Sequence, residues 1–409
     1  MTMQAGLRPG PWLGLCALLA ATATGLVIAF AVSGFGRLHV ILSLAALAPL
    51  AALVAMARAA HPQLRRPAYV ATALLIGQVG LGALVAATGD TPWIRGTHVA
   101  ASALCFAAVL VLAVRARQGA APAARGAWRD YITLTKPRIM VLLLLTAACG
   151  MFVAAQGLPP LGTFVATMAG LALACGGASA LNHVLDRDID VHMARTDRRP
   201  VAAQRVPAAR ALEFGLALSA FSFVLLASAT NLLTAVLALV GNLFYVVVYT
   251  GYLKRRTAQN IVIGGAAGAV PPLVGYAAVS GNLTLAALIL FLIVFVWTPP
   301  HFWALALLIQ RDYRAAGVPM LPVVRGAPET ARMIVRYSVL LVLVTLLPVA
   351  TGDLNWVYGL AALVLGAWFV WLAIRLRAQP TPHAAKALFH YSLLYLALVF
   401  VALAVAAAV

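Results

Sequence analysis

Residues 182–200 read NHVLDRDIDVHMARTDRRP and gather acids and arginines beside an apolar run. The chain has ten acidic residues in 409 positions, and four of them lie between positions 186 and 197. Asn182, Asp186 and Asp190 are spaced so that a helix places their oxygen atoms on one face. Such oxygens bind hard divalent cations, and the nearby arginines suit an anionic substrate. The stretch predicts a site for a metal ion and a diphosphate; the alternatives are a helix-capping cluster or a salt-bridge network in a loop.

The composition is that of a membrane protein. The chain is 64% hydrophobic and 10% charged, with a mean hydropathy of +0.98, whereas soluble domains have roughly a quarter charged residues. The net charge of +19 could suggest a nucleic-acid partner. The lysines and arginines lie instead in short loops between apolar runs, as the positive-inside rule requires. We therefore expect the lipid bilayer as a partner and no nucleic acid.

Thirteen apolar runs are long enough to cross about 30 Å of hydrocarbon as helices. Four precede a polar segment that contains Ala and Arg, and nine follow it. They cover about 12–33, 38–57, 68–88, 96–114, 139–156, 161–182, 211–229, 232–251, 261–279, 283–306, 333–350, 355–374 and 387–408. We predict an all-α, polytopic membrane protein with a four-helix bundle at 1–117, a linker at 118–130 and a nine-helix bundle at 131–409.

The loops also predict an orientation. With thirteen spans, the strongly basic loops all fall on one side, and the opposite loops hold almost no cations beyond Arg37 and Arg95. Positively charged loops face the cytoplasm. The N-terminus and residues 182–200 are therefore expected on the cytoplasmic side of the cell's inner (plasma) membrane.

Two histidines stand out in the first four runs. His39 and His98 lie near the starts of the second and fourth runs, at similar depth on two parallel helices. Facing histidines in a four-helix bundle are a common way to hold haem; the alternative is two interfacial histidines satisfied by water or backbone. The stretch 77–82 (GQVGLG), with Thr97-His98, resembles one half of the haem A synthase family. That resemblance implies a bundle that holds haem or docks haem A synthase, with a degenerate structural remnant as the rival.

Three more elements accompany residues 182–200. Lys254 and Arg255 lie on the same predicted side of the membrane, followed by Asn260. A span with paired prolines reads WTPPHFW at 297–303, where His301 could contact a flat aromatic substrate; a packed interfacial histidine is an equal alternative. Asp312 follows in a predicted cytoplasmic loop and could complete a second metal site.

Taken together, these elements resemble the protoheme IX farnesyltransferase (haem O synthase) branch of the UbiA-type intramembrane prenyltransferases. The resemblance covers about two-thirds of the chain. In the second acidic motif of the wider superfamily, the second Asp would fall at Ala316, which leaves the number of metal ions open. The matching stretches are 135–138, 182–200, 252–260, 297–303 and 312–320.

The resemblance implies nine helices around a cavity, with farnesyl diphosphate and haem B as substrates and haem O as product. Mg²⁺ would be held by Asn182, Asp186, Asp190 and Asp312, which are the expected catalytic residues. The expected substrate-binding residues are Arg138, Arg195, Arg199, Lys254, Arg255, Asn260 and His301.

Two other functions fit part of the pattern. A UbiA-type prenyltransferase could act on a quinone precursor, although residues 297–303 and 312–322 argue against it. A transporter could use intramembrane acids as an ion path. The acids here cluster beside arginines at the predicted cytoplasmic rim rather than at the midplane, and dependence on Mg²⁺ and prenyl diphosphate separates the two classes.

Overall fold

The structure of the chain is a computed structural model. It describes residues 64–88 and 127–409, together with nine isolated positions before residue 113: Ala51, Ala55, His98, Ala101, Cys105, Ala108, Val109, Val111 and Leu112. In the front segment, helix α3 (Arg65–Thr88) matches the third predicted span. The first, second and fourth predicted spans, the linker and His39 lie wholly or largely outside the described residues, so the four-helix bundle stays a prediction.

Between residues 127 and 409 the structure contains nine helices apolar and long enough to cross a membrane. This confirms the predicted nine-span bundle, with span limits that differ from the predicted ones by up to seven residues. The spans are α6 (Pro137–Ala155), α7 (Leu161–Leu185), α9 (Ala208–Ala229), Leu232–Arg256, α12 (Asn260–Ser280), α13 (Leu285–Leu308), Gly326–Ala350, α18 (Trp356–Ala378) and α19 (Pro382–Ala408).

Two of these spans are built from several elements. Leu232–Arg256 consists of α10 (Leu232–Leu243), the π-helix η2 (Phe244–Leu253) and α11 (Lys254–Arg256). Gly326–Ala350 consists of α16 (Gly326–Thr345) and α17 (Leu347–Ala350). Within residues 127–409, four short helices lie outside the spans: α5 (Trp128–Thr135), α8 (Arg187–Asp190), α14 (Gln310–Ala315) and α15 (Leu321–Val324).

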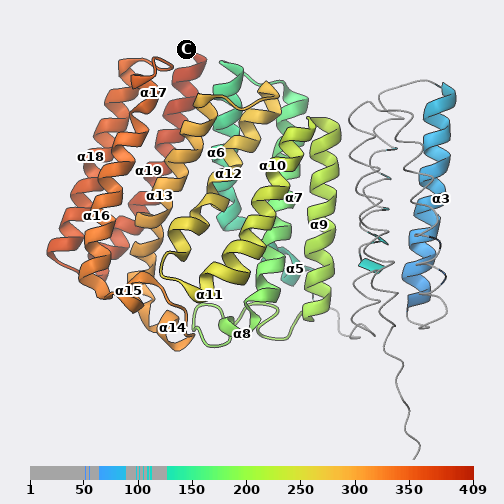
Figure 1. The fold of residues 1–409 in the computed structure, drawn as a ribbon, viewed down its shortest axis with the longest axis horizontal. Helices are drawn as coiled ribbons and strands as arrows, with labels where there is room; N and C mark the ends of the chain where they lie inside the picture. Colours follow the sequence, from blue (N-terminus) through green and yellow to red (C-terminus); the bar gives the residue numbers. More distant parts are fainter. Residues whose placement is uncertain are drawn as a thin grey trace, which may run out of the picture.

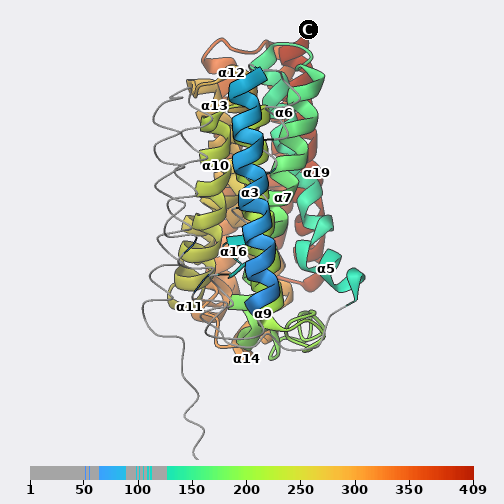
Figure 2. The ribbon, with the colours of Figure 1, turned by 90° about the vertical axis from the view of Figure 1, so that its right-hand side faces the viewer.

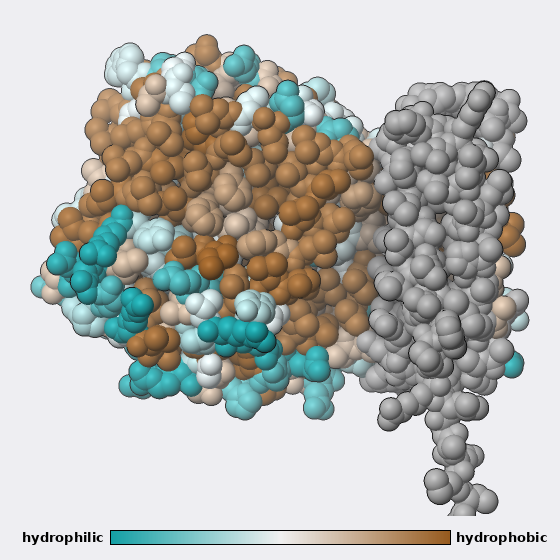
Figure 3. Space-filling model, in the orientation of Figure 1, coloured by the Kyte–Doolittle hydropathy of each residue, from teal (hydrophilic) through white to brown (hydrophobic). Residues whose placement is uncertain are grey.

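The spans run side by side, and their connections lie at the two ends of the bundle (Figures 1 and 2). A broad hydrophobic band covers the middle of the face seen in Figure 3, with hydrophilic residues above and below it. The hydrophilic surface is densest at the lower end, where α8 and α14 lie in Figure 1. An apolar belt between polar ends is the surface expected of a protein that spans a bilayer.

Local signals in the sequence set several helix starts. The Asn231 side chain accepts a hydrogen bond from the Thr234 amide at 2.9 Å, which caps α10. Asn355 and Thr381 cap α18 and α19 in the same way. Such caps satisfy amide groups that have no partner inside the helix.

Glycines allow the closest contacts between spans. A Cβ atom on Gly150 of α6 would lie 2.6 Å from the Pro272 carbonyl oxygen of α12, and a Cβ on Gly275 would collide with the Ala147 carbonyl oxygen. Small residues at helix crossings let backbones approach in membrane bundles, where lipid offers no hydrophobic drive for association. This crossing joins the first half of the bundle to α12, which begins at the polar end.

Candidate functional site

Asn182 occupies the centre of a buried polar cluster at the lower end of the bundle. It lies on the last turn of α7 and is 3% exposed. Its Oδ1 accepts a hydrogen bond from Lys136 Nζ at 2.7 Å. Its Nδ2 donates to Asp186 Oδ2 at 2.8 Å and to Thr250 Oγ1 at 3.1 Å. Three elements therefore meet at one amide: α7, the turn between α5 and α6, and η2.

Asp186 is 1% exposed and lies one turn after Asn182. Lys254 Nζ donates to its Oδ2 at 2.5 Å, and Lys254 is itself buried. The other oxygen, Oδ1, is buried without a hydrogen-bond partner among the described residues. A buried carboxylate oxygen without a partner needs an explanation, and a bound ion is one. We call Asn182, Asp186 and Asp190 the acid cluster.

Asp190 ends α8 and is 1% exposed. Arg199 Nη1 lies 2.8 Å from both of its carboxylate oxygens, and the Thr196 hydroxyl donates to its backbone carbonyl at 3.1 Å. The chain thus folds back after α8, so that arginine and acid from the same 19-residue stretch, 182–200, pair with each other. The predicted proximity of acids and arginines is present.

Lys136 was not among the predicted site residues, although it lies in a matched stretch. It adopts a left-handed conformation, with φ of 51°, between the end of α5 and Pro137, the first residue of α6. This one-residue turn aims the side chain at Asn182. Burial, and next the charge of Arg199, hold the pKa of Lys136 well below its usual value. The charges of Asp186, Lys254 and Asp190 also shift the pKa of Lys136. Lys136, Lys254 and Arg199, which we call the three cations, therefore form one electrostatic group with the acid cluster.

Two other polar residues of this region were missed. Thr250 is fully buried on η2, and nothing in its apolar surroundings in the sequence marks it. His183 is 1% exposed, and both its ring nitrogens are buried without a hydrogen-bond partner in the described part of the chain. The signal in the sequence that could have identified His183 is its position directly after Asn182. A π-helix often occurs at functional sites, and here η2 brings both Thr250 and Lys254 to the acid cluster.

Arg255 is held at the edge of the acid cluster. Its Nη1 and Nη2 donate to the Asp188 carboxylate at 2.7 and 2.8 Å, and Nη2 also donates to the Leu185 carbonyl oxygen at 2.6 Å. The hydrogen bonds from Arg255 lower the pKa of Asp188 to about 2. Arg255 therefore fastens α11 to the end of α7 in this structure, and its predicted contact with substrate stays a prediction.

The loop that follows α13 faces the arginines of residues 182–200. Tyr313 on α14 is 2% exposed and lies beside Arg195 and Arg199. Burial raises the pKa of the Tyr313 hydroxyl to about 12, which keeps it neutral. Its neighbour Asp312 is half-buried, and the Asp312 carboxylate makes no hydrogen bond or ion pair within residues 127–409. Asp312 is thus placed on the facing loop, and its role as a metal ligand stays a prediction.

The remaining predicted residues are spread around this end. Asn260 is fully buried; its Nδ2 lies 3.5 Å from the Lys254 carbonyl oxygen, and its Oδ1 has no partner among the described atoms. Arg138 is exposed one residue into α6, and Arg195 is exposed in the loop. Their contacts with substrate stay predictions.

His301 lies on α13 in an aromatic stack. Its ring stacks on Trp297, with centroids 4.2 Å apart, and on Phe389 of α19, with centroids 4.9 Å apart. Its neighbour Phe302 packs against the apolar cluster that contains Met193 and Tyr249, which borders residues 182–200. The predicted aromatic environment of His301 is present, and it connects to the acid cluster through this apolar layer.

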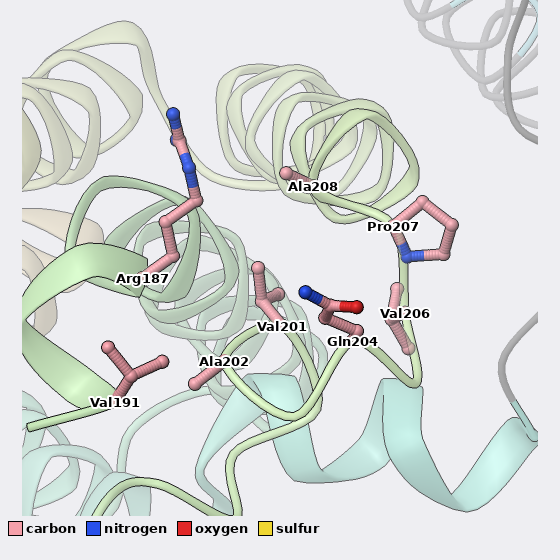
Figure 4. Close-up of a pocket in the computed structure, with 8 residues that line it drawn as sticks. All are labelled: Arg187, Val191, Val201, Ala202, Gln204, Val206, Pro207 and Ala208. Atoms are coloured by element: carbon pink, nitrogen blue, oxygen red, sulfur yellow. The ribbon is translucent and has the colours of Figure 1, made fainter.

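A hollow lies beside the acid cluster. Its volume is about 390 Å³, and its lining does not include Asn182, Asp186 or Asp190. Figure 4 shows Arg187 and Val191 on one side of it, with Pro207 and Ala208 on the other. Its wall is formed by residues of α8, of the start of α9 and of the loop between them, and it includes no buried acid, so we do not assign the chemistry to this hollow.

Of the two histidines predicted to hold haem, the structure describes His98 and not His39. His98 Nε2 lies 3.2 Å from Gln78 Nε2 on α3, and a Cβ on Gly82 would be 3.1 Å from His98 Cε1. The GQVGLG stretch therefore contacts His98, and a haem at this position stays a prediction.

The donors of the acid cluster suit a hard cation. Within the described ranges, no group of three or more His, Cys, Asp or Glu side chains forms a metal centre. The acid cluster offers two carboxylates and one amide oxygen, and Asp186 Oδ1 is buried without a partner among the described residues. Oxygen donors of this kind fit Mg²⁺, which commonly uses one or two carboxylates together with substrate phosphates.

The fold and this cluster define a multi-pass membrane protein with a buried acid and cation site at one end of the bundle. A profile of the UbiA prenyltransferase family matches residues 143–408. A "Protoheme IX farnesyltransferase" of Symbiobacterium thermophilum (strain DSM 24528 / JCM 14929 / IAM 14863 / T) is 54% identical over 277 residues, which are 67% of this chain and 93% of the relative. The chain belongs to the UbiA prenyltransferase family.

A second relative is longer. The "Protoheme IX farnesyltransferase" of Roseiflexus sp. (strain RS-1) is 53% identical over 277 residues, which are 68% of this chain and 52% of that protein. The chain spans about half the length of this relative and of three other curated relatives it matches.

Solved structures share the fold. One described as a digeranylgeranylglyceryl phosphate synthase in membranes has a TM-score of 0.58 at 18% identity, covering 68% of this chain and 98% of that chain. A UbiA homologue from Archaeoglobus fulgidus bound to GPP and Mg²⁺ has a TM-score of 0.50 at 16% identity, covering 67% and 99%. At these identities the likeness shows the fold alone.

Proposed function

We propose that this protein transfers the farnesyl group of farnesyl diphosphate to a vinyl group of haem B. The product is haem O, whose hydroxyethylfarnesyl group contains one added water, and diphosphate is released. Membership of the UbiA prenyltransferase family supports the reaction class. The relatives named protoheme IX farnesyltransferase, at 53–54% identity, support haem as the acceptor.

The observation that carries the proposal is the buried group of Asn182, Asp186 and Asp190 with Lys136, Lys254 and Arg199. A diphosphate is a concentrated negative charge and needs cations from the protein. A metal ion held at the same place needs carboxylates. Both kinds of group meet here in a largely buried environment, where fixed charges act more strongly than in water.

Asn182, Asp186 and Asp190 would hold Mg²⁺, with Asp312 as a further ligand from the facing loop. Bound there, the ion supplies positive charge that stabilises the departing diphosphate. The Archaeoglobus fulgidus homologue, whose structure was solved with GPP and Mg²⁺ bound together, supports Mg²⁺ as the ion that accompanies the diphosphate.

The cations of the chain have a double role in the proposal. Lys254 and Arg199 neutralise Asp186 and Asp190 in the structure described here. When a diphosphate and its metal arrive, these side chains are free to turn to the phosphate oxygens. Lys136 becomes a third positive charge at Asn182 when a diphosphate binds, because a nearby anion favours the charged form of a lysine whose pKa burial has lowered. Arg138, Arg195 and Arg255 would extend the positive rim, and Asn260 positions the Lys254 backbone.

The transfer itself breaks the allylic C–O bond, and the positive rim binds the diphosphate that leaves. The farnesyl cation then forms a C–C bond with the terminal vinyl carbon of haem B. Water adds to the other vinyl carbon and loses a proton, which gives the hydroxyl group of haem O. Exclusion of bulk water from the apolar bundle protects the allylic cation until the acceptor reacts. His301, in its aromatic stack, would contact the haem.

We further propose that the acid cluster faces the cytoplasm from the inner membrane, because the basic loops share its end. The front segment, with His39 and His98, would hold haem or dock haem A synthase. Its histidines are expected near the outer leaflet, so a docking or structural role fits better than direct transfer of haem across the bilayer.

The test uses purified protein in detergent with haem B, farnesyl diphosphate and Mg²⁺. We expect a farnesylated, hydrated haem in the mass spectrum and released diphosphate. Asp186→Asn removes a carboxylate that would hold Mg²⁺, so we expect turnover to fall on the order of a hundredfold or more, since losing one group that supports transition-state charge typically costs about 10²–10³ in kcat.

Asp197→Asn is the matched control, because it removes the same charge from an exposed residue of the same stretch. We expect its turnover to stay within about twofold, as surface substitutions usually change little. Prenylation of a quinone precursor but not of haem would move the protein to another branch of the family. Full activity of Asp186→Asn would reject the assignment of the site.

A further inference from the structure

Ser392 on α19 holds two aromatic side chains of α13. Its hydroxyl lies 2.6 Å from His301 Nδ1, and its backbone carbonyl accepts a hydrogen bond from Trp297 Nε1 at 2.8 Å. Ser392 is fully buried, and α13 and α19 pack side by side (Figure 1). Trp297 and His301 are one helical turn apart and stack on each other. One serine therefore anchors both rings from the neighbouring helix.

The direction of these hydrogen bonds decides which nitrogen of His301 carries the proton. The Ser392 hydroxyl donates to the Phe389 carbonyl oxygen at 2.6 Å. A carbonyl oxygen can only accept, and a hydroxyl has one proton to donate. When this proton is donated to Phe389, the Ser392 oxygen accepts from His301 Nδ1–H. In this arrangement neutral His301 carries its proton at Nδ1 and a lone pair at Nε2.

The surroundings leave Nε2 as the available atom of this ring. The two ring faces are engaged by Trp297 and Phe389, at centroid distances of 4.2 and 4.9 Å. Nδ1 is engaged by Ser392. Nε2 makes no hydrogen bond within the described residues, and the side chain is half-buried rather than enclosed. A neutral imidazole with Nδ1–H bonded and Nε2 open is the arrangement found in histidines that bind metals.

We propose that Ser392 is a positioning residue that fixes the Nδ1–H tautomer of His301 and presents Nε2 to the iron of the haem acceptor. The proposal rests on the proposed function, because it takes haem as the substrate. Ser392 does not touch the substrate and acts only through His301 and Trp297. An Nε2 ligand at the iron would hold the macrocycle by its centre, which constrains where its vinyl groups can lie relative to the acid cluster.

The test measures haem B and farnesyl diphosphate separately on the full-length protein. Ser392→Ala removes the hydroxyl acceptor but keeps the backbone carbonyl that holds Trp297. We expect haem B to bind about tenfold more weakly, because a buried hydrogen-bond partner is lost. The KM for haem B should rise by a similar factor, and the KM for farnesyl diphosphate should stay unchanged. The absorption spectrum of bound ferrous haem should show less of its histidine-ligated form, and His301→Ala should lack that form.

Two controls separate this role from simple packing. Ser338→Ala makes the same change at a fully buried serine of α16, whose hydroxyl donates only to the Ile334 carbonyl of its own helix. We expect it to match the wild-type protein in haem affinity and spectrum. Ser392→Thr keeps a hydroxyl group and should restore the wild-type spectrum.

Each outcome decides the matter. If the wild-type protein makes haem O and Ser392→Ala matches it in haem affinity and spectrum, the proposal for Ser392 is wrong while the proposed function stands. Equal increases of both KM values, or equal effects in Ser338→Ala, would also overturn it. If the wild-type protein does not bind haem B or modify it, both proposals fail.

Discussion

At the scale of single residues, the site depends on how one amide is oriented. Lys136 binds the oxygen of Asn182, while Asp186 and Thr250 accept from its nitrogen. Lys136 holds this position in a left-handed conformation, φ 51°, directly before a proline. Such a backbone is uncommon for residues other than glycine and costs of order 1–3 kcal/mol, which the surrounding structure must offset. The cost indicates that the placement of this ammonium matters.

We predict that Lys136→Met lowers kcat/KM for farnesyl diphosphate about 10- to 100-fold, because a hydrogen bond from a charged donor is worth about 1.5–3 kcal/mol. Thr250→Val removes a neutral partner of the same amide, and its effect should be about tenfold or less. Steady-state kinetics with varied farnesyl diphosphate measure both. A Lys136→Met enzyme as active as the wild type, or a larger loss in Thr250→Val, contradicts this ranking.

At the scale of elements, helix crossings decide whether the polar end is assembled. α6 begins after Lys136, and α12 begins at Asn260; the two meet at Gly150 and Gly275. We predict that Gly275→Ala destabilises the protein by about 1–3 kcal/mol, because its new methyl group would overlap the Ala147 carbonyl and force the helices apart. Thermal unfolding in detergent should show a lower Tm.

Gly268→Ala is the control on the same helix, since nothing lies within 4 Å of its added Cβ. Alanine favours helix over glycine by up to about 1 kcal/mol, so its Tm should be unchanged or slightly higher. If Gly275→Ala unfolds at the same temperature as Gly268→Ala, the close approach of α6 and α12 does not limit stability.

At the scale of the whole molecule, the acid cluster and the three cations (Lys136, Lys254 and Arg199) all come from positions 136–254. The Symbiobacterium relative is matched over 93% of its length by only 67% of this chain, so a protein of that name exists without most of the front segment. We predict that residues 118–409 alone form haem O with kcat within about twofold of the full chain. The reason is that changes far from the site, with no shared contacts, usually act independently of it.

The comparison uses both proteins in the same detergent, with product formation followed by mass. A well-folded truncated protein that makes no haem O would assign the front segment an essential role. Retained activity would direct the search for its role toward haem storage or the docking of haem A synthase.

The sequence by itself determined the helical, membrane-spanning class and the positions of the nine later spans. Lipid offers no hydrogen bonds, so each long apolar run must satisfy its own backbone as a helix, and run length is enough to find it. The spacing of Asn182, Asp186 and Asp190 is likewise local. Helical periodicity predicted these three side chains on one face; the structure has Asn182 bonded to Asp186, with α7 ending at Leu185 and Asp190 on the separate short helix α8.

Only the tertiary structure decided which distant partners reach these residues. Lys136 bonds Asn182 across 46 positions, Lys254 bonds Asp186 across 68, and Ser392 bonds His301 across 91. In a membrane bundle the lipid-facing and the interior faces are both apolar, so hydropathy does not reveal which face of a helix packs inward. That choice depends on close packing at sites such as Gly150 and Gly275, which becomes visible only when the helices are assembled.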